Sequence, residues 1–204
     1  MRSSWIISRS PLLLVTLWLL SLTLSSCSEE YVPFPRKYGF HRIDIPAVTQ
    51  YQTFSNAACP FSFEYPEGGR ISRESPDSCW TDIYFPAYDC TWHFTYRQAE
   101  ESGKARGVHF EEYRGLIYKH SKKASQIKES RLDMASGKGV KFELYGNVGT
   151  PEQLFFHDAS EQEIMMMSFY FNTAMKNDSL QPVIVHMKDQ LDHMLESFTW
   201  ENAL

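Results

Sequence analysis

The chain has 204 residues, a formal net charge of −5 and an aromatic content of 15%. This length allows one domain with a sizeable buried core. The acidic balance, with only a local cluster of Lys119, Lys122 and Lys123, argues against a nucleic-acid-binding protein. The aromatic content favours a sheet-rich core.

The first 26 residues are typical of a lipoprotein signal peptide. Arg2 and Arg9 precede and flank an apolar run, Pro11–Leu24, which is shorter than the roughly 20 residues that a membrane-spanning helix needs. The run ends in Leu24-Ser25-Ser26-Cys27, which resembles a bacterial lipobox. This resemblance implies cleavage before Cys27 and attachment of acyl chains such as palmitate to it. The alternative is an uncleaved membrane helix with a chance cysteine.

The residues that follow Cys27 bear on the location of the protein. Ser28 stands where an aspartate usually retains enterobacterial lipoproteins in the inner membrane, so we expect the outer membrane. The acidic stretch Ser28–Glu30 is weakly similar to a surface-export tag of Bacteroidota, and the periplasmic face stays the expected one. Residues 27–50 are interpreted as an acylated, extended tether, because two prolines lie within Tyr31–Tyr38. We expect Gly39–Pro46 to lie along the domain surface.

Residues 51–204 predict a single domain. Apolar and polar residues alternate in Phe61–Tyr65, which predicts a strand, and a turn follows at Pro66–Gly69. After three further strands, the spacing of the apolar residues changes to that of a helix. The elements that we expect in this half are strands over Gly69–Glu74, Trp80–Phe85 and Cys90–Arg97 and a helix over Gly107–Ala124.

The second half predicts a further set of strands and a last helix. The strand Ile164–Phe171 is apolar on both faces, so we expect it in the interior of a sheet covered on both sides. The apolar stripe of the last helix begins after Asn177 and ends at Phe198. The other expected strands are Gln126–Asp133, Val140–Tyr145 and Gln153–His157.

This order of elements predicts an α+β fold in which one largely antiparallel β-sheet has flanking helices. The order opens on FSFEYP and closes on an amphipathic helix that ends in LESFTW. In both respects it is similar to the PsbP-type αβα sandwich. This is an analogy of fold, and it carries no function.

Three cysteines remain after Cys27, so three pairings are possible for one disulfide. We expect Cys59–Cys79, because each precedes an apolar, strand-like run and the loop of about twenty residues would stabilise the fold. Cys90 alternates with aromatic residues in CTWHFTYR and is expected to be a buried, inert thiol. The alternative for Cys90 is a reactive nucleophile.

The candidate metal ligands are weak. His186 and His193 flank the stripe of the last helix, but a metal site needs three or four converging ligands. The simpler interpretation is a solvated border of the helix, and we interpret His109 and His120 in the same way.

The hydrolase and copper candidates are weak too. His157, Asp158 and Ser160 have the residue types of a hydrolase triad, but neighbours on a strand point to opposite faces. Alternation on a strand also separates the thioethers of Met165–Met167, so we expect them to fill the core rather than bind copper.

Six stretches stand out in the chain: Pro35–Pro46, Cys59–Pro66, Cys79-Trp80, Gly146–Ser160, Ser168–Asn172 and Asn177–Val183. In their order and spacing they resemble the GldD family of gliding motility lipoproteins of Bacteroidota. That resemblance implies no enzymatic activity, no cofactor and no catalytic residues. It implies an outer-membrane lipoprotein that supports the assembly or stability of the gliding motility and type IX secretion machinery, together with other lipoproteins and outer-membrane components. The alternative is an envelope enzyme, or a ligand or metal carrier, that uses the histidines of the last helix.

Overall fold

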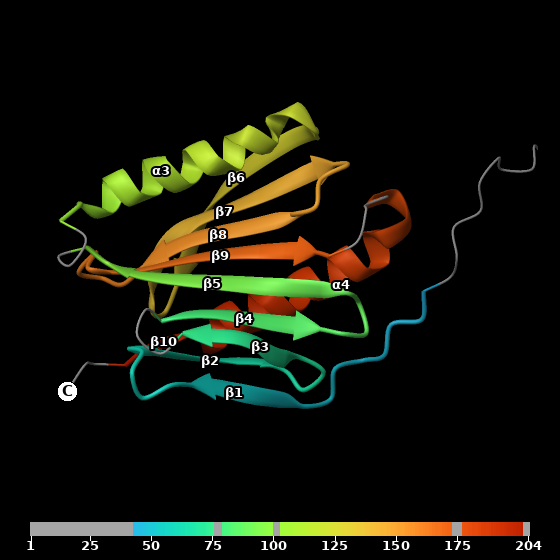
Figure 1. Ribbon diagram of the computed structural model, residues 1–204, viewed down its shortest axis with the longest axis horizontal. Coiled ribbons are helices and arrows are strands. Elements are labelled where there is room, and N and C mark those ends of the chain that lie inside the picture. The colour runs from blue at the N-terminus through green and yellow to red at the C-terminus, as the bar shows by residue number, and fades with distance from the viewer. Residues whose placement is uncertain (1–42, 76–78, 100–102, 173–176, 202–204) are drawn as a thin grey trace, which may run out of the picture. The chain divides into compact units, whose positions relative to one another are not determined.

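The structure is a computed structural model, and it describes residues 43–75, 79–99, 103–172 and 177–201 (Figure 1). All of them belong to one compact unit, Phe40–Leu204. The expected signal peptide, Cys27 and the tether up to residue 42 lie outside the described residues. Ile43 and Ile45 pack against the main core, so the packed part of the chain starts before Tyr51.

Most of the described strands form one antiparallel sheet of seven strands, in the order β3-β4-β5-β9-β8-β7-β6 (Figure 1). Strand β9 pairs with β5 on one side and with β8 on the other, which confirms the expected interior strand. The bounds are β3 (Arg70–Ser75), β4 (Trp80–Phe85), β5 (Cys90–Gln98), β6 (Ala124–Met134), β7 (Gly137–Gly146), β8 (Glu152–His157) and β9 (Glu163–Phe171).

Three further strands of the described chain form a second antiparallel sheet, in the order β1-β2-β10. Their bounds are β1 (Tyr51–Ser55), β2 (Phe61–Pro66) and β10 (Thr199–Trp200). The α+β class and the antiparallel pairing are therefore as expected, but there are two sheets rather than one. Strand β1 was not predicted, because Phe54 is its only buried residue and the strand carries almost no apolar pattern.

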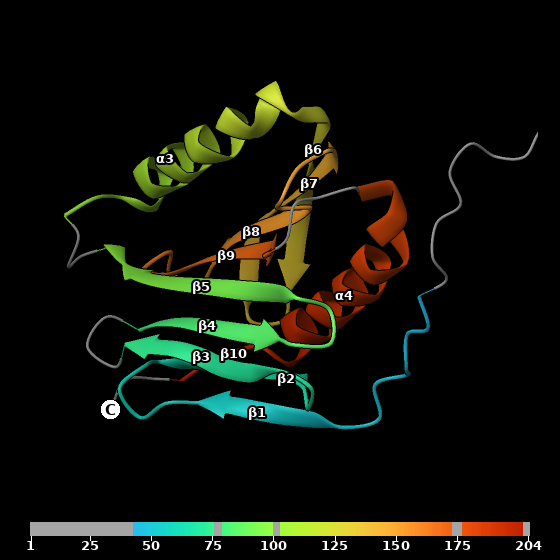
Figure 2. The ribbon, with the colours of Figure 1, turned by 45° about the vertical axis from the view of Figure 1, so that its right-hand side comes forward.

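The helices of the described chain are α3 (Arg106–Tyr118), the short 3-10 helix η1 (Lys119–Lys122) and α4 (Asn177–Ser197). Helix α3 ends earlier than expected because the residues of η1 are polar and none of them is buried. Helix α4 lies between the strands β8 and β9 and the small sheet (Figure 2). None of the helices among the described residues is long and apolar enough to cross a membrane.

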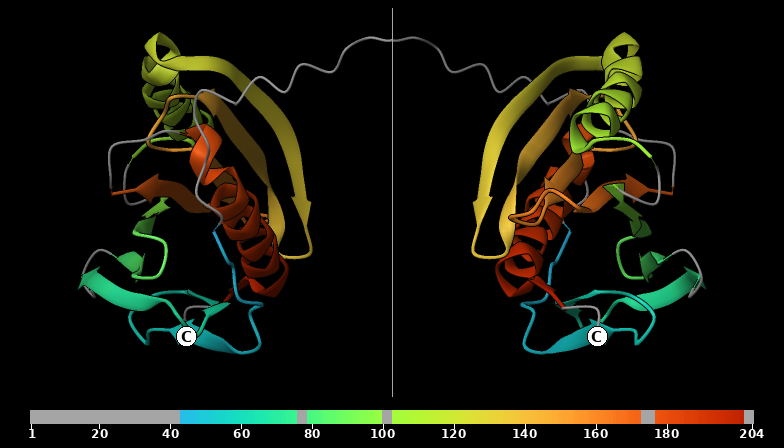
Figure 3. Two further views of the ribbon diagram at one scale, coloured as in Figure 1. Left: turned by 90° about the vertical axis from the view of Figure 1, so that its right-hand side faces the viewer. Right: turned by 90° about the vertical axis from the view of Figure 1, so that its left-hand side faces the viewer.

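The two helices cover opposite faces of the large sheet (Figure 3). Alternation along β9 shows this directly, because Met165 and Met167 belong to the core under α4, whereas Ile164 and Met166 pack with the core under α3. The first core also contains the aromatic residues of β2 and β5. Met165 and Met167 fill this core, as the alternation predicts.

Candidate functional site

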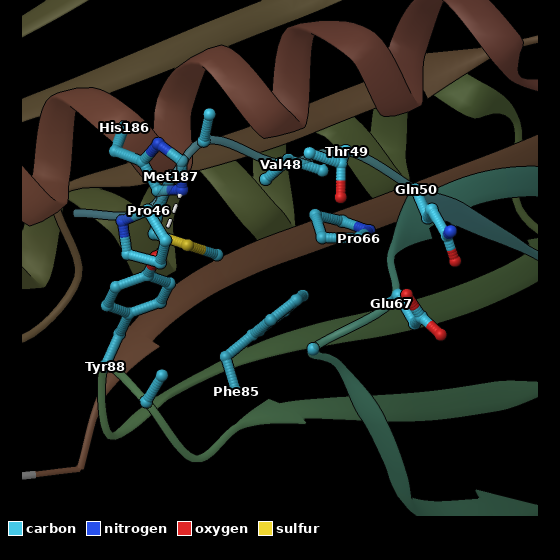
Figure 4. Close-up of a pocket in the computed structure, with 13 residues that line it drawn as sticks. Pro46, Val48, Thr49, Gln50, Pro66, Glu67, Phe85, Tyr88, His186 and Met187 are labelled. Carbon is cyan, nitrogen blue, oxygen red and sulfur yellow. Dashed lines mark hydrogen bonds between the residues drawn. The ribbon is translucent and has the colours of Figure 1, made fainter.

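The concave site of interest is a pocket of about 200 Å³ where four segments of the chain meet (Figure 4). Pro46–Gln50 forms one side, and the turns after β2 and after β4 form two others. Helix α4 closes the pocket with His186 and Met187. Sites for drug-sized ligands have volumes of roughly 300–1,000 Å³, so this pocket suits one small apolar group better than a large ligand.

The walls of the pocket are mainly apolar, and its polar groups come from the segment Pro46–Gln50, from the turns and from α4. Phe85 and Met187 are buried and form the floor. The Nε2 atom of His186 lies 3.4 Å from the hydroxyl of Tyr88, and the two rings meet edge to face. Burial lowers the pKa of His186, so its imidazole is neutral at neutral pH. Glu67 is the one carboxylate among the described lining residues.

His193 lies elsewhere on α4 and does not share partners with His186. Its ring stacks on Tyr51, and its Nε2 atom lies 2.9 Å from a carboxylate oxygen of Glu64. Within the described residues there is no group of three or more His, Cys, Asp or Glu side chains that could hold a metal ion. Both histidines are half-buried at the border of the apolar stripe of α4, and each contacts a side chain of the fold.

His157, Asp158 and Ser160 are close together but do not form a triad. The Nδ1 atom of His157 lies 2.7 Å from the backbone oxygen of Asp158, not from its carboxylate. That carboxylate accepts hydrogen bonds from the side chain of Ser160 and from the backbone amides of the turn before β9. Burial alone would raise the pKa of Asp158, but these hydrogen bonds lower it. The carboxylate therefore organises a turn.

One acid–histidine pair was not predicted. The Nδ1 atom of His93 on β5 lies 2.7 Å from a carboxylate oxygen of Asp82 on β4, and Asp82 is buried. The polar alternation of β5 indicates that His93 faces away from the main core, but its partner depends on the register between β4 and β5. Such a pair can orient an imidazole, although a hydrolase also needs a nucleophile in line with it.

His109 corrects one expectation from the sequence. It was expected on a solvated border, but only 7% of it is exposed, and it lies on the buried side of α3 with Tyr113 and Ile117. These three side chains follow one another at intervals of four residues, and this helical spacing could have indicated from the sequence that His109 lies on the buried face. Burial lowers the pKa of His109, which favours the neutral form.

The structure contains a disulfide between Cys59 and Cys79, with Cα atoms 5.5 Å apart. Cys59 precedes β2 and Cys79 precedes β4, so the bond joins the small sheet to the large one. Cys90 is a buried free thiol. Burial raises the pKa of Cys90 to about 12, which disfavours a reactive thiolate.

In a comparison with protein families, the family model described as gliding motility lipoprotein GldD matches residues 29–200. The matched range contains the sheets and α-helices of the described residues and every residue that lines the pocket. A comparison with curated proteins gives no match.

Proposed function

The chain belongs to the GldD family of gliding motility lipoproteins, and from this we propose that it is a non-catalytic lipoprotein of the gliding motility and type IX secretion machinery. Its role is to support the assembly or the stability of that machinery. The match of the family model over nearly the whole chain is the observation that carries the proposal.

The anchor in this proposal is a lipid on Cys27. The lipobox-like stretch that ends at Cys27 supports it, and Ser28 in place of an aspartate favours the outer membrane. The periplasmic face is the default, because the match of Ser28–Glu30 to a surface-export tag is weak. Several acyl chains on one residue give stable attachment, since each buried methylene contributes about 0.8 kcal/mol. Other lipoproteins and outer-membrane components of the machinery are then within reach of the domain.

The contacts of the histidines support a role without catalysis. His186 contacts Tyr88, and His157 contacts the backbone of its own turn. His193 is held by a ring on β1 and a carboxylate on β2. These contacts stabilise the fold, and among the described residues the histidines do not converge with the further ligands that a metal site needs. The pocket is the first place to look for a contact with a partner, because a small apolar group fits it.

Complementation of a deletion strain tests the proposal. Cys27→Ala removes the proposed lipid site. Ala87→Trp introduces a large ring at the exposed rim of the pocket while leaving the core intact. We expect Cys27→Ala to lose gliding or secretion. Loss with Ala87→Trp would identify the pocket as a contact, whereas full activity would direct attention to another face. Full activity of Cys27→Ala would contradict the proposal.

A further inference from the structure

Glu152 is a carboxylate buried between β8 and α4. Only 1% of the residue is exposed, and it lies opposite Glu143 on β7 and Phe169 on β9. Its two oxygens lie 3.5 Å from the amine of Lys188 and 3.8 Å from that of Lys141. Among the described residues, no donor makes a hydrogen bond to its Oε1 atom. A buried carboxylate with an oxygen that accepts no hydrogen bond is costly to keep ionised, even beside cations.

The other charges around Glu152 are paired among themselves. From β7 come Lys141 and Glu143, from α4 come Lys188 and Asp192, and β9 presents the apolar Phe169. Lys188 lies 2.8 Å from Glu143, and Lys141 forms an ion pair with Asp192. Each lysine that faces Glu152 therefore keeps another carboxylate if Glu152 becomes neutral.

Glu152 and Glu143 differ in how they titrate. Burial raises the pKa of Glu152 to about 7, because it outweighs the attraction of Lys141 and Lys188. Burial alone would raise the pKa of Glu143 as well, but hydrogen bonds and charge pairs with Lys188 and Lys128 lower it to about 2. Near neutral pH, Glu143 is thus ionised, whereas Glu152 changes its charge.

We propose that Glu152, Lys141 and Lys188 form a proton-sensitive latch that holds α4 on the large sheet more tightly when the Glu152 carboxyl is protonated. When α4 opens, water solvates this carboxyl and its pKa returns towards 4.5, the ordinary value of a glutamate. The docked state therefore binds a proton that the open state releases. The added stability is fully present below pH 4.5 and is lost as the pH rises through about 7.

The latch acts on the pocket through α4. Lys188 directly follows His186 and Met187, which form the helical wall of the pocket. A helix that opens more often at higher pH holds this wall less firmly. The latch depends only on the fold and on this charge network, so its test is independent of the test of the proposed function.

Hydrogen exchange of the amides of α4 in the full-length protein tests the latch. The rates are corrected for the intrinsic pH dependence of exchange and converted to opening constants at pH 6 and pH 8. We expect the opening constant of wild-type α4 to be about tenfold larger at pH 8, which is the effect of losing one proton bound with a pKa near 7. In Glu152→Gln the ratio should fall below about twofold.

Glu196→Gln is the matched control, because Glu196 is an exposed carboxylate of the same helix. It should keep the tenfold ratio. His186 also titrates, but it is present in every variant, so the comparison cancels its contribution. Equal opening constants at pH 6 and pH 8 in the wild type would overturn the latch, as would an unchanged ratio in Glu152→Gln or a lost ratio in Glu196→Gln.

A direct titration keeps the test decisive if Glu152→Gln fails to fold. The carboxyl carbon shift of Glu152 in the wild-type protein, followed by NMR, should have its midpoint near pH 7. A midpoint near pH 4.5 would overturn the latch.

Discussion

The imidazole of His193 stacks on the phenol ring of Tyr51, with ring centroids 3.8 Å apart and ring planes inclined by 23°. This contact joins α4 to the edge strand of the small sheet. The hydroxyl of Tyr51 also donates a hydrogen bond of 2.9 Å to Gln190, which lies one turn earlier on α4. A side chain that the sequence offers as a weak metal ligand is therefore a packing contact between two elements.

His193→Ala should lower the free energy of unfolding by about 1–2 kcal/mol, because it removes one ring stack and one hydrogen bond. Denaturant unfolding measures this change. Glu196→Ala, an exposed substitution on the same helix, should change stability by less than about 0.5 kcal/mol. Unchanged stability in His193→Ala, together with loss of a bound metal, would instead support the carrier alternative.

The pairing of β7 with β8 requires Gly139. A Cβ atom at this position would lie 2.1 Å from the backbone oxygen of Phe155, which is too close for any side chain. Gly139→Ala should therefore destabilise the protein by at least about 2 kcal/mol. Gly115→Ala is the control, because no atom lies within 4 Å of its added methyl group. The control should stabilise α3 by about 0.5–1 kcal/mol, and similar effects at both sites would contradict the strand register.

The disulfide should stabilise the joined sheets. Cys59 and Cys79 are 20 residues apart, so replacing both with serine should cost about 3 kcal/mol in unfolding experiments. Reduction of the wild-type protein should lower its denaturation midpoint to that of the double variant. If a reductant left the midpoint of the wild-type protein unchanged, the bond would not contribute to stability.

The thiol of Cys90 should be unreactive in the folded protein, since it is fully buried and burial raises its pKa to about 12. A maleimide added under native conditions should leave the Cys90 peptide unlabelled, as judged by mass spectrometry, and denaturant should make it label completely. Rapid labelling of the native protein would revive the nucleophile alternative.

The sequence predicts most of the large sheet, because its strands carry strong local patterns. The alternation of β5 and the two apolar faces of β9 are examples. Strand β1 and the two-residue β10 carry too little pattern to be seen. β1 pairs with the strand that follows it in the chain, but the pairing of β10 with β2 joins segments far apart in the sequence. One sheet was therefore expected where there are two.

The sites depend on contacts that no local pattern encodes. The pair of Asp82 and His93 depends on the register of two strands, and the pocket depends on four segments that meet. Glu152 sits in a stretch, TPEQ, that is polar in sequence, yet it is buried because α4 covers it. Tertiary packing therefore determines the pair of Asp82 and His93, the pocket and the burial of Glu152.

The most direct test of the account is complementation of the deletion strain, with secretion of a type IX cargo as the readout. Variants that fold and reach wild-type levels are compared: Cys27→Ala removes the proposed lipid site, while His93→Ala and His186→Ala remove candidate catalytic groups. The account predicts that both histidine variants restore secretion and that Cys27→Ala does not. Restoration by Cys27→Ala, with loss in either histidine variant, would contradict it and would favour an envelope enzyme.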